Sequence, residues 1–184
     1  MKKILNVFVL FFVLFYISTA YAAMPKVQEI TTPKGYKPWM VEDHYLPIVS
    51  IKLAFKNSGT AYDAKDKLGL AYMVSSLLDE GAGGISPLDF RKKLEELATG
   101  ISFDVDEDNF YVSLKTLTEN VPESLRLLNL ALTKADFEPQ AVERIRNQIL
   151  VLLTKNEESP EYVAARKFRE EIFAMHPYSN TKYG

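Results

Sequence analysis

Apolar side chains recur along the chain with two different periods, which predict strands and helices in turn. Apolar and polar residues alternate over residues 49–55, as in a half-buried strand whose buried side chains are Val49, Ile51, Leu53 and Phe55. The same alternation returns over residues 101–105 and 110–114, on either side of an acidic turn at 106–109. These two segments predict an antiparallel hairpin. Residues 39–41 predict one further short strand.

Five other segments show the helical period. The first, residues 66–80, ends at Gly81 and has an apolar stripe of Leu70, Val74, Leu77 and Leu78. The second begins with Ser86 as its N-cap and Pro87 at the first helical position, and turns Phe90, Leu94 and Leu97 inward. The last three are expected over residues 122–134, 139–156 and 160–175.

This order of elements predicts an α+β fold, with a mainly antiparallel sheet and helices packed on one face. The middle of the last three helices is expected to turn Val142, Ile145, Ile149, Leu152 and Leu153 into the core. The folded domain is expected to span residues 38–184, after a polar lead-in at 23–37. The final residues, 176–184, resemble a loop cut off before its next element, so we expect a truncated domain or the product of a split gene.

The first 22 residues have the composition of a secretory signal peptide. Two lysines precede an apolar run from Ile4 to Ile17, and Ala20-Tyr21-Ala22 forms a cleavage site. An uncleaved inner-membrane anchor is the alternative, because the run is just long enough to span a bilayer. Cleavage would leave a net charge of 20 − 24 = −4 and a periplasmic protein. The chain has no cysteine, and no basic patch indicates nucleic-acid binding.

Four short stretches, taken in order, resemble one known family. They are residues 41–50 (VEDHYLPIVS), residues 59–63 followed by Gly69-Leu70-Ala71, residues 157–160 and residues 176–178. Their order and spacing resemble the insulinase/pitrilysin zinc metallopeptidase family, which includes the mitochondrial processing peptidase subunits. The resemblance implies an α+β domain that is normally duplicated within one polypeptide, of which this chain holds most of one copy.

The family's signature is His-x-x-Glu-His on a helix, with a third zinc ligand, a glutamate, about 76 residues further on. In this chain the five motif positions read Tyr72-Met73-Val74-Ser75-Ser76. The alignment therefore places Tyr72 and Ser76 at the two histidines, Ser75 at the general base and Leu152 at the distal glutamate. Hydroxyl groups are poor zinc ligands and leucine is none, so the resemblance implies no catalytic residue, no metal site and no cofactor here.

Two interpretations of the degenerate motif remain open. Either Tyr72, Ser75 and Ser76 form the polar face of an amphipathic helix, or they line a relic pocket whose hydroxyls hold a peptide backbone. Leu152 lies on the same predicted stripe as Ile145 and Ile149, so we expect the former ligand position to be part of the core.

Other polar residues give weaker signals. His44 and His176 lie 132 residues apart and are expected to be surface histidines. Asp79 and Glu80 are adjacent, so on a helix they point apart. The acidic turn is formed by Asp104, Asp106, Glu107 and Asp108; it lacks the spacing of a known calcium loop and is expected to be a solvated turn.

In the family that the chain resembles, peptides bind in extended form beside a sheet edge near the zinc helix. The matching strand here would be Ser102-Phe103-Asp104-Val105, for which a plain core strand is the alternative. Our first hypothesis is an exported, catalytically inactive subunit that pairs with an active zinc peptidase of the same family. The alternatives are a stand-alone peptide-binding or scaffold domain, an enzyme with an unusual metal site, and a remnant of a split gene.

Overall fold

The computed structural model describes residues 26–184, so the predicted signal peptide at 1–22 lies outside the described residues. The chain divides into a unit that ends at Leu46 and a second unit, Pro47–Gly184. In the first unit, β1 (Val27–Glu29) pairs antiparallel with β2 (Trp39–Val41). The strand at 39–41 is thus confirmed, whereas β1 lies in the segment that we interpreted as a lead-in, and the polar residues around it hid a three-residue strand.

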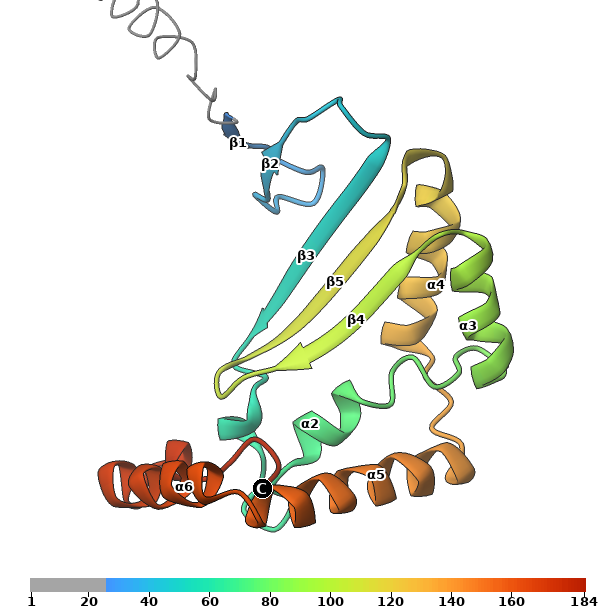
Figure 1. The fold of residues 1–184 in the computed structure, drawn as a ribbon. Coiled ribbons are helices and arrows are strands. Elements are labelled where there is room, and N and C mark those ends of the chain that lie inside the picture. Colours follow the sequence, from blue (N-terminus) through green and yellow to red (C-terminus); the bar gives the residue numbers. More distant parts are fainter. Residues whose placement is uncertain (1–25) are drawn as a thin grey trace, which may run out of the picture. The chain divides into compact units, whose positions relative to one another are not determined.

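The second unit is built on a three-stranded antiparallel sheet with the order β3-β5-β4 (Figure 1). The strands are β3 (Ile48–Lys56), β4 (Gly100–Val105) and β5 (Asn109–Leu117). Val105 pairs with Phe110, so the predicted hairpin and its turn are confirmed. On the other side of β5, Ile51 pairs with Leu114. Both outer strands have one edge without a partner among the described strands.

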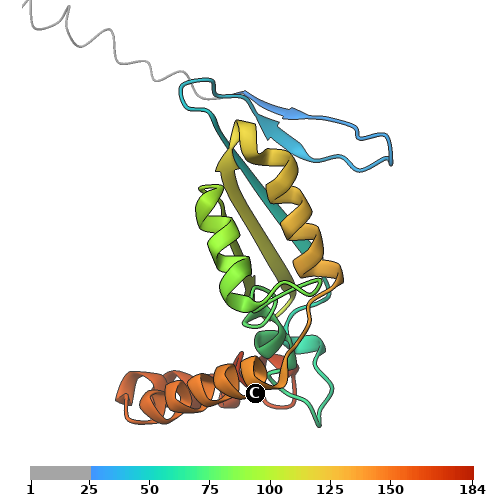
Figure 2. The same cartoon turned by 90° about the vertical axis from the view of Figure 1, so that its right-hand side faces the viewer.

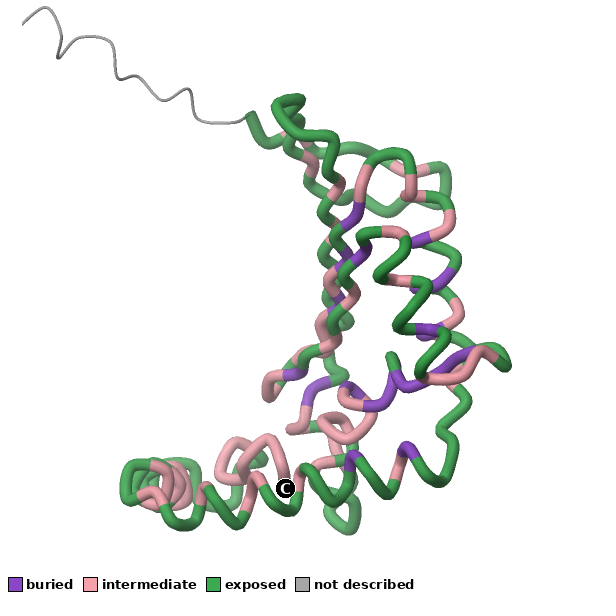
Figure 3. The backbone as a smooth tube through the Cα atoms, turned by 45° about the vertical axis from the view of Figure 1, so that its right-hand side comes forward, coloured by how far each residue is buried: buried purple, intermediate pink, exposed green. Residues whose placement is uncertain are grey.

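Two helices cover one face of this sheet, as Figures 1 and 2 show: α3 (Pro87–Glu96) and α4 (Val121–Thr133). Ser86 caps α3 as predicted, and its side chain accepts a hydrogen bond from the Asp89 backbone. The buried residues gather between these helices and strands β4 and β5 (Figure 3). They form two adjoining clusters, Ala82, Phe90, Leu127 and Ala131 in one, and Val112, Leu114 and Leu128 in the other.

The apolar row of β3 is covered less well than the alternation predicts. Leu53 and Phe55 face the helical side beside buried strand β5, yet they are 39% and 44% exposed. Helices α3 and α4 pack over β4 and β5 and leave this outer strand partly open. The predicted α+β fold with helices on one face is therefore confirmed, with a core that is centred on β5 and β4.

The last two helices lie beyond one end of the sheet instead of on its face (Figure 1). They are α5 (Pro139–Glu157) and α6 (Pro160–Phe173), the latter capped by Ser159 as predicted. On α5, Ala141 and Ile145 are buried, whereas the rest of the predicted inward stripe is only half-buried. The helix itself was predicted correctly, but its apolar stripe meets loop and helix side chains and does not reach the sheet core.

The first predicted helix is much shorter than the expected span of 66–80. Helix α2 covers only Leu70–Ser75, because Gly69 before it has a left-handed φ of 83°. After Ser76 the chain continues in turns, with the Leu77 and Glu80 amides bonded three residues back. These turns bury Leu77 and Leu78. The prediction of a continuous helix was wrong because this apolar spacing also fits a short helix followed by buried turns.

Three buried hydroxyl groups join the sheet to α4. Thr99 lies just before β4, Thr116 on β5 and Ser124 on α4. Their oxygens are 2.7 to 2.9 Å apart in all three pairs. All three residues are buried, so the Thr116 and Ser124 hydroxyls depend on this cluster for their hydrogen bonds, whereas the Thr99 hydroxyl is also 3.2 Å from the Leu97 carbonyl.

Substituting Thr116→Val keeps the shape of the side chain but leaves the Thr99 and Ser124 hydroxyls without one partner. We expect the free energy of unfolding to fall by about 1–3 kcal/mol, measured by urea denaturation. The control is Thr118→Val at an exposed position, which should change it by less than about 0.5 kcal/mol. Equal midpoints for the two variants would show that the cluster contributes nothing.

Candidate functional site

The degenerate motif positions lie on α2, where their hydroxyl groups are used within the helix. The Ser75 hydroxyl donates to the Tyr72 carbonyl at 2.8 Å, and the Ser76 hydroxyl donates to the same carbonyl at 3.0 Å. Ser75 is buried. Both hydroxyls donate to the helix backbone, so neither lies free to hold a peptide, and the burial of Ser75 does not fit an exposed polar face.

Tyr72, at the position of the first motif histidine, belongs to an aromatic cluster with the end of the chain. Its ring contacts the Tyr183 ring edge-on, with centroids 4.7 Å apart. The Lys182 ammonium lies 5.2 Å from the Tyr72 centroid and 5.4 Å from that of Tyr183, in cation–π range of both. Burial, with a smaller contribution from Tyr183, raises the pKa of Tyr72, so this side chain is a neutral phenol at physiological pH.

A hollow of about 320 Å³ separates α2 from α5, and Leu153 contributes to it together with Tyr72. Ile149 and Leu150 also line this hollow, but Leu152 does not. Leu152 is half-buried and lies outside the two buried clusters, so the expectation that it is part of the core was wrong. Leu153, one position further along, lines the hollow that Tyr72 also lines.

The residues at this site do not fit a zinc ion. The hydroxyls of Ser75 and Ser76 are bonded to the helix backbone, and Tyr72 is a neutral phenol. The α5 residues that line the hollow are one arginine and three aliphatic residues, none of which is a zinc ligand. Zinc sites in proteins use histidine, cysteine or carboxylate groups. Within residues 26–184, no three such groups lie close enough together to hold a metal ion.

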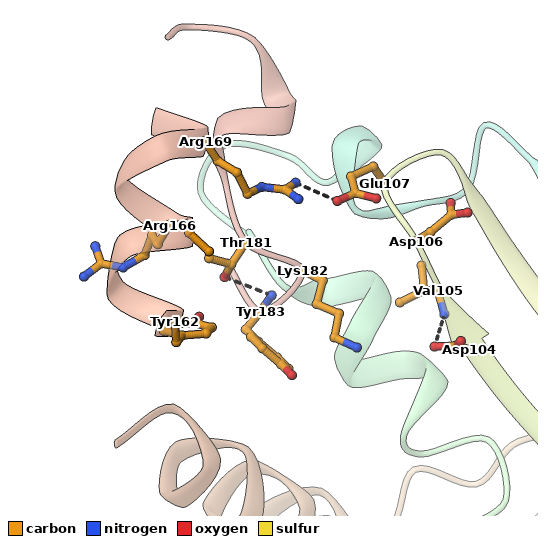
Figure 4. Close-up of a pocket in the computed structure, with 11 residues that line it drawn as sticks. Asp104, Val105, Asp106, Glu107, Tyr162, Arg166, Arg169, Thr181, Lys182 and Tyr183 are labelled. Atoms are coloured by element: carbon orange, nitrogen blue, oxygen red, sulfur yellow. Dashed lines mark hydrogen bonds and ion pairs between the residues drawn. The ribbon is translucent and has the colours of Figure 1, made fainter. Parts of the chain in front are cut away.

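A second cavity, of about 400 Å³, lies at the end of β4 (Figure 4). It is enclosed by the last residues of β4, the hairpin turn, α6 and the segment Thr181–Tyr183. Its lining includes three carboxylates, three basic side chains and two tyrosines: Asp104, Asp106, Glu107, Arg166, Arg169, Lys182, Tyr162 and Tyr183. Of the predicted peptide-binding strand, Asp104 and Val105 reach this cavity, whereas Ser102 and Phe103 do not line it.

The acidic turn is tied to the C-terminal part of the chain and is not simply solvated. Glu107 forms an ion pair with Arg169 on α6, at 2.6 Å. Asp108 accepts a hydrogen bond of 2.7 Å from the Tyr178 hydroxyl, which raises the pKa of Tyr178 to about 12. The turn is solvated in part, as expected, since Asp104 and Asp108 are exposed. Its contacts with Arg169 and Tyr178 were not expected, because these partners lie 62 and 70 residues further along the chain.

The remaining candidate residues are either exposed at the surface or paired with other side chains of the fold. His44 and His176 are both exposed, and the His176 ring accepts a hydrogen bond from the Tyr178 amide. Glu80 is buried behind α2, paired with Arg144 on α5 and with Arg91 on α3 at 3.8 Å. It lies in a turn beyond α2, not on a helix, and it joins three elements of the fold.

Comparison with known proteins identifies the family. The sequence profile of the insulinase family (peptidase family M16) matches residues 39–184. The chain belongs to the M16 family. A curated relative, the non-peptidase homolog YmxG of Helicobacter pylori, is 31% identical over 143 residues, which are 78% of this chain and 33% of the relative. This M16 chain therefore spans about a third of the length of that relative.

Two solved structures show the same fold. The inactive M16 peptidase domain from Pseudomonas fluorescens superposes with a TM-score of 0.79 at 25% identity, over 86% of this chain and 39% of that one. A protease from Helicobacter pylori superposes with a TM-score of 0.72 at 18% identity, over 88% of this chain and 39% of that one. The second likeness concerns the fold alone.

The Glu107–Arg169 pair makes stability depend on pH. The hydrogen bond from Arg169 holds the pKa of Glu107 below its usual range, so the contact stabilises the fold above the ordinary glutamate pKa and is lost as the pH falls. When the pH is lowered from about 6 to about 3, we expect the urea midpoint of Glu107→Gln to fall less than that of the parent chain. Glu96→Gln, in an exposed pair with Lys92, should follow the parent closely.

The side chains at the motif positions also predict how much zinc the purified chain binds. After incubation with zinc and removal of excess ions, we expect the purified chain to retain well below one zinc ion per molecule by elemental analysis, because no imidazole or carboxylate replaces the lost ligands. A zinc peptidase treated in parallel is the positive control. Retention near one ion per chain, together with chelator-sensitive peptide cleavage, would contradict this expectation.

Proposed function

We propose that this chain is a catalytically inactive M16 domain that pairs with an active zinc peptidase of the same family. The observation that carries the proposal is the chemistry on α2, where no side chain at the motif positions can activate a zinc-bound water. The names of its relatives support it, since one is a non-peptidase homolog and another an inactive domain. Zinc-dependent hydrolysis would then have to come from the partner.

The surface of the last two helices supports pairing. Leu150 and Val151 on α5 are 48% and 69% exposed, and Phe168 and Ile172 on α6 are 66% and 56% exposed. Phe168 and Ile172 are four residues apart on α6 and therefore lie on one side of that helix. Exposed large apolar side chains, such as the pair on α6, are typical of a surface that another protein covers.

Peptide binding is the second function that a specific observation favours. Strand β4 pairs with β5 on one side, and its other edge has no partner among the described strands. Phe103 packs against the core, whereas Ser102 and Asp104 are exposed on the opposite face. An extended peptide can add to such an edge through main-chain hydrogen bonds, which need no catalytic side chain.

Export to the periplasm completes the proposal, on the strength of the signal-like sequence at residues 1–22. From Lys26 onward, none of the helices has both the length and the apolar composition needed to cross a bilayer.

Pairing can be tested by expressing the tagged chain together with an M16 protein from the same genome that retains His-x-x-Glu-His. We expect the two to co-purify in a fixed ratio, and the double variant Phe168→Glu, Ile172→Glu to reduce recovery of the partner several-fold. Leu88→Glu on α3, where the leucine is 73% exposed, is the matched control and should leave recovery unchanged. Failure to recover the partner with the parent chain would refute pairing.

A further inference from the structure

The cavity of about 400 Å³ described above continues the open edge of β4. It begins at Asp104 and Val105, the last two residues of that strand, and is closed at its far side by α6 and by Thr181–Tyr183 (Figure 4). A peptide that added to the β4 edge would therefore run into this cavity at one of its two ends. Which end enters depends on the direction of the peptide.

The sheet geometry favours an antiparallel peptide. Both strand pairs of this sheet are already antiparallel, and antiparallel pairing is the slightly more stable arrangement. Strand β4 runs from Gly100 to Val105, so an antiparallel neighbour begins beside Val105 and ends beside Gly100. The amino terminus of such a peptide lies at the cavity.

Most charges that line the cavity are already neutralised. Arg169 is paired with Glu107, and Arg166 is paired with Glu157 at 2.9 Å and Glu170 at 3.1 Å. Three lining charges remain outside the ion pairs of the described residues, namely Asp104, Asp106 and Lys182. Two carboxylates thus face one ammonium, and the balance favours a cationic ligand.

Of the two unpaired carboxylates, Asp104 is the one that can accept further hydrogen bonds. Asp106 accepts hydrogen bonds from the Asp108 and Asn109 amides at 2.8 and 2.6 Å and from the Tyr111 hydroxyl at 2.8 Å. Asp104 accepts a single bond, from the Val105 amide to one oxygen, at 2.9 Å. Its second oxygen has no donor among residues 26–184, and an ionised carboxylate can accept several hydrogen bonds.

We propose that this cavity binds the amino-terminal ammonium group of an extended peptide, with Asp104 as its acceptor. The proposal rests on the peptide-binding function of the β4 edge. Lys182, whose ammonium is held over the rings of Tyr72 and Tyr183, opposes the bound ammonium from the other side of the cavity and limits its affinity. Asp104 and Lys182 therefore have opposite effects on the same ligand.

The probes are octapeptides of several unrelated sequences without lysine or arginine, each made with a free and with an acetylated amino terminus and labelled at the carboxyl end. Binding to the chain, expressed alone, is measured by fluorescence anisotropy. We expect acetylation to weaken binding about tenfold, because it removes one charge-assisted hydrogen bond. Asp104→Asn should abolish the difference between the two forms, and Asp66→Asn, at an exposed aspartate, should preserve it.

Lys182→Met provides the opposite test, since it removes the competing cation and should tighten binding of the free-amine peptides only. If the cavity instead binds a carboxylate, the two variants reverse their effects, and the proposal is wrong. Equal binding of free and acetylated peptides would refute amino-terminal recognition while leaving the β4 edge as a binding surface. Binding by neither form would refute the edge function itself. Unchanged circular dichroism and thermal midpoints would confirm that the variants are folded.

Discussion

The ion pair between Glu107 and Arg169 holds together the parts of the molecule that form the candidate site. It joins the tip of the β4–β5 hairpin to α6, and the Asp108–Tyr178 hydrogen bond fixes the following segment to the same tip. With those two contacts in place, Lys182 and Tyr183 reach α2 and pack on Tyr72. Both cavities depend on this arrangement, since Tyr183 lines each of them.

The fold could be predicted from the sequence wherever the local pattern decides the structure. The hairpin follows from strict alternation and a polar turn, and Ser86 and Ser159 mark helix starts because their side chains satisfy backbone amides. The length of α2 could not be predicted, because periodicity does not distinguish a helix from turns that bury Leu77 and Leu78. The partial burial of the apolar stripe on α5 could not be predicted either, because burial depends on where elements that are distant in the sequence pack.

In the candidate site, too, local features could be predicted from the sequence and contacts between distant residues could not. The replacement of the motif histidines by Tyr72 and Ser76 is visible from spacing along one helix. Which α5 residues lie near Tyr72 is not visible from the sequence, because the count along the chain passes through several loops. Leu153 lines the hollow beside Tyr72, whereas Leu152, the counted position, does not. Lys182 and Arg169 had no local signal at all. Their roles arise from contacts between residues that are tens of positions apart, which no short motif records.

Loss of the zinc ligands need not end peptide recognition in this fold, because the two functions use different groups. Zinc-dependent hydrolysis requires imidazole or carboxylate ligands, and the motif positions on α2 lie outside the two buried clusters of the sheet core. The proposed recognition at the β4 edge would use main-chain groups that any sequence provides, so it requires only that the strand stays at the edge. The residues that adjust it, such as Asp104 at the end of β4, are then free to vary independently of the lost metal site.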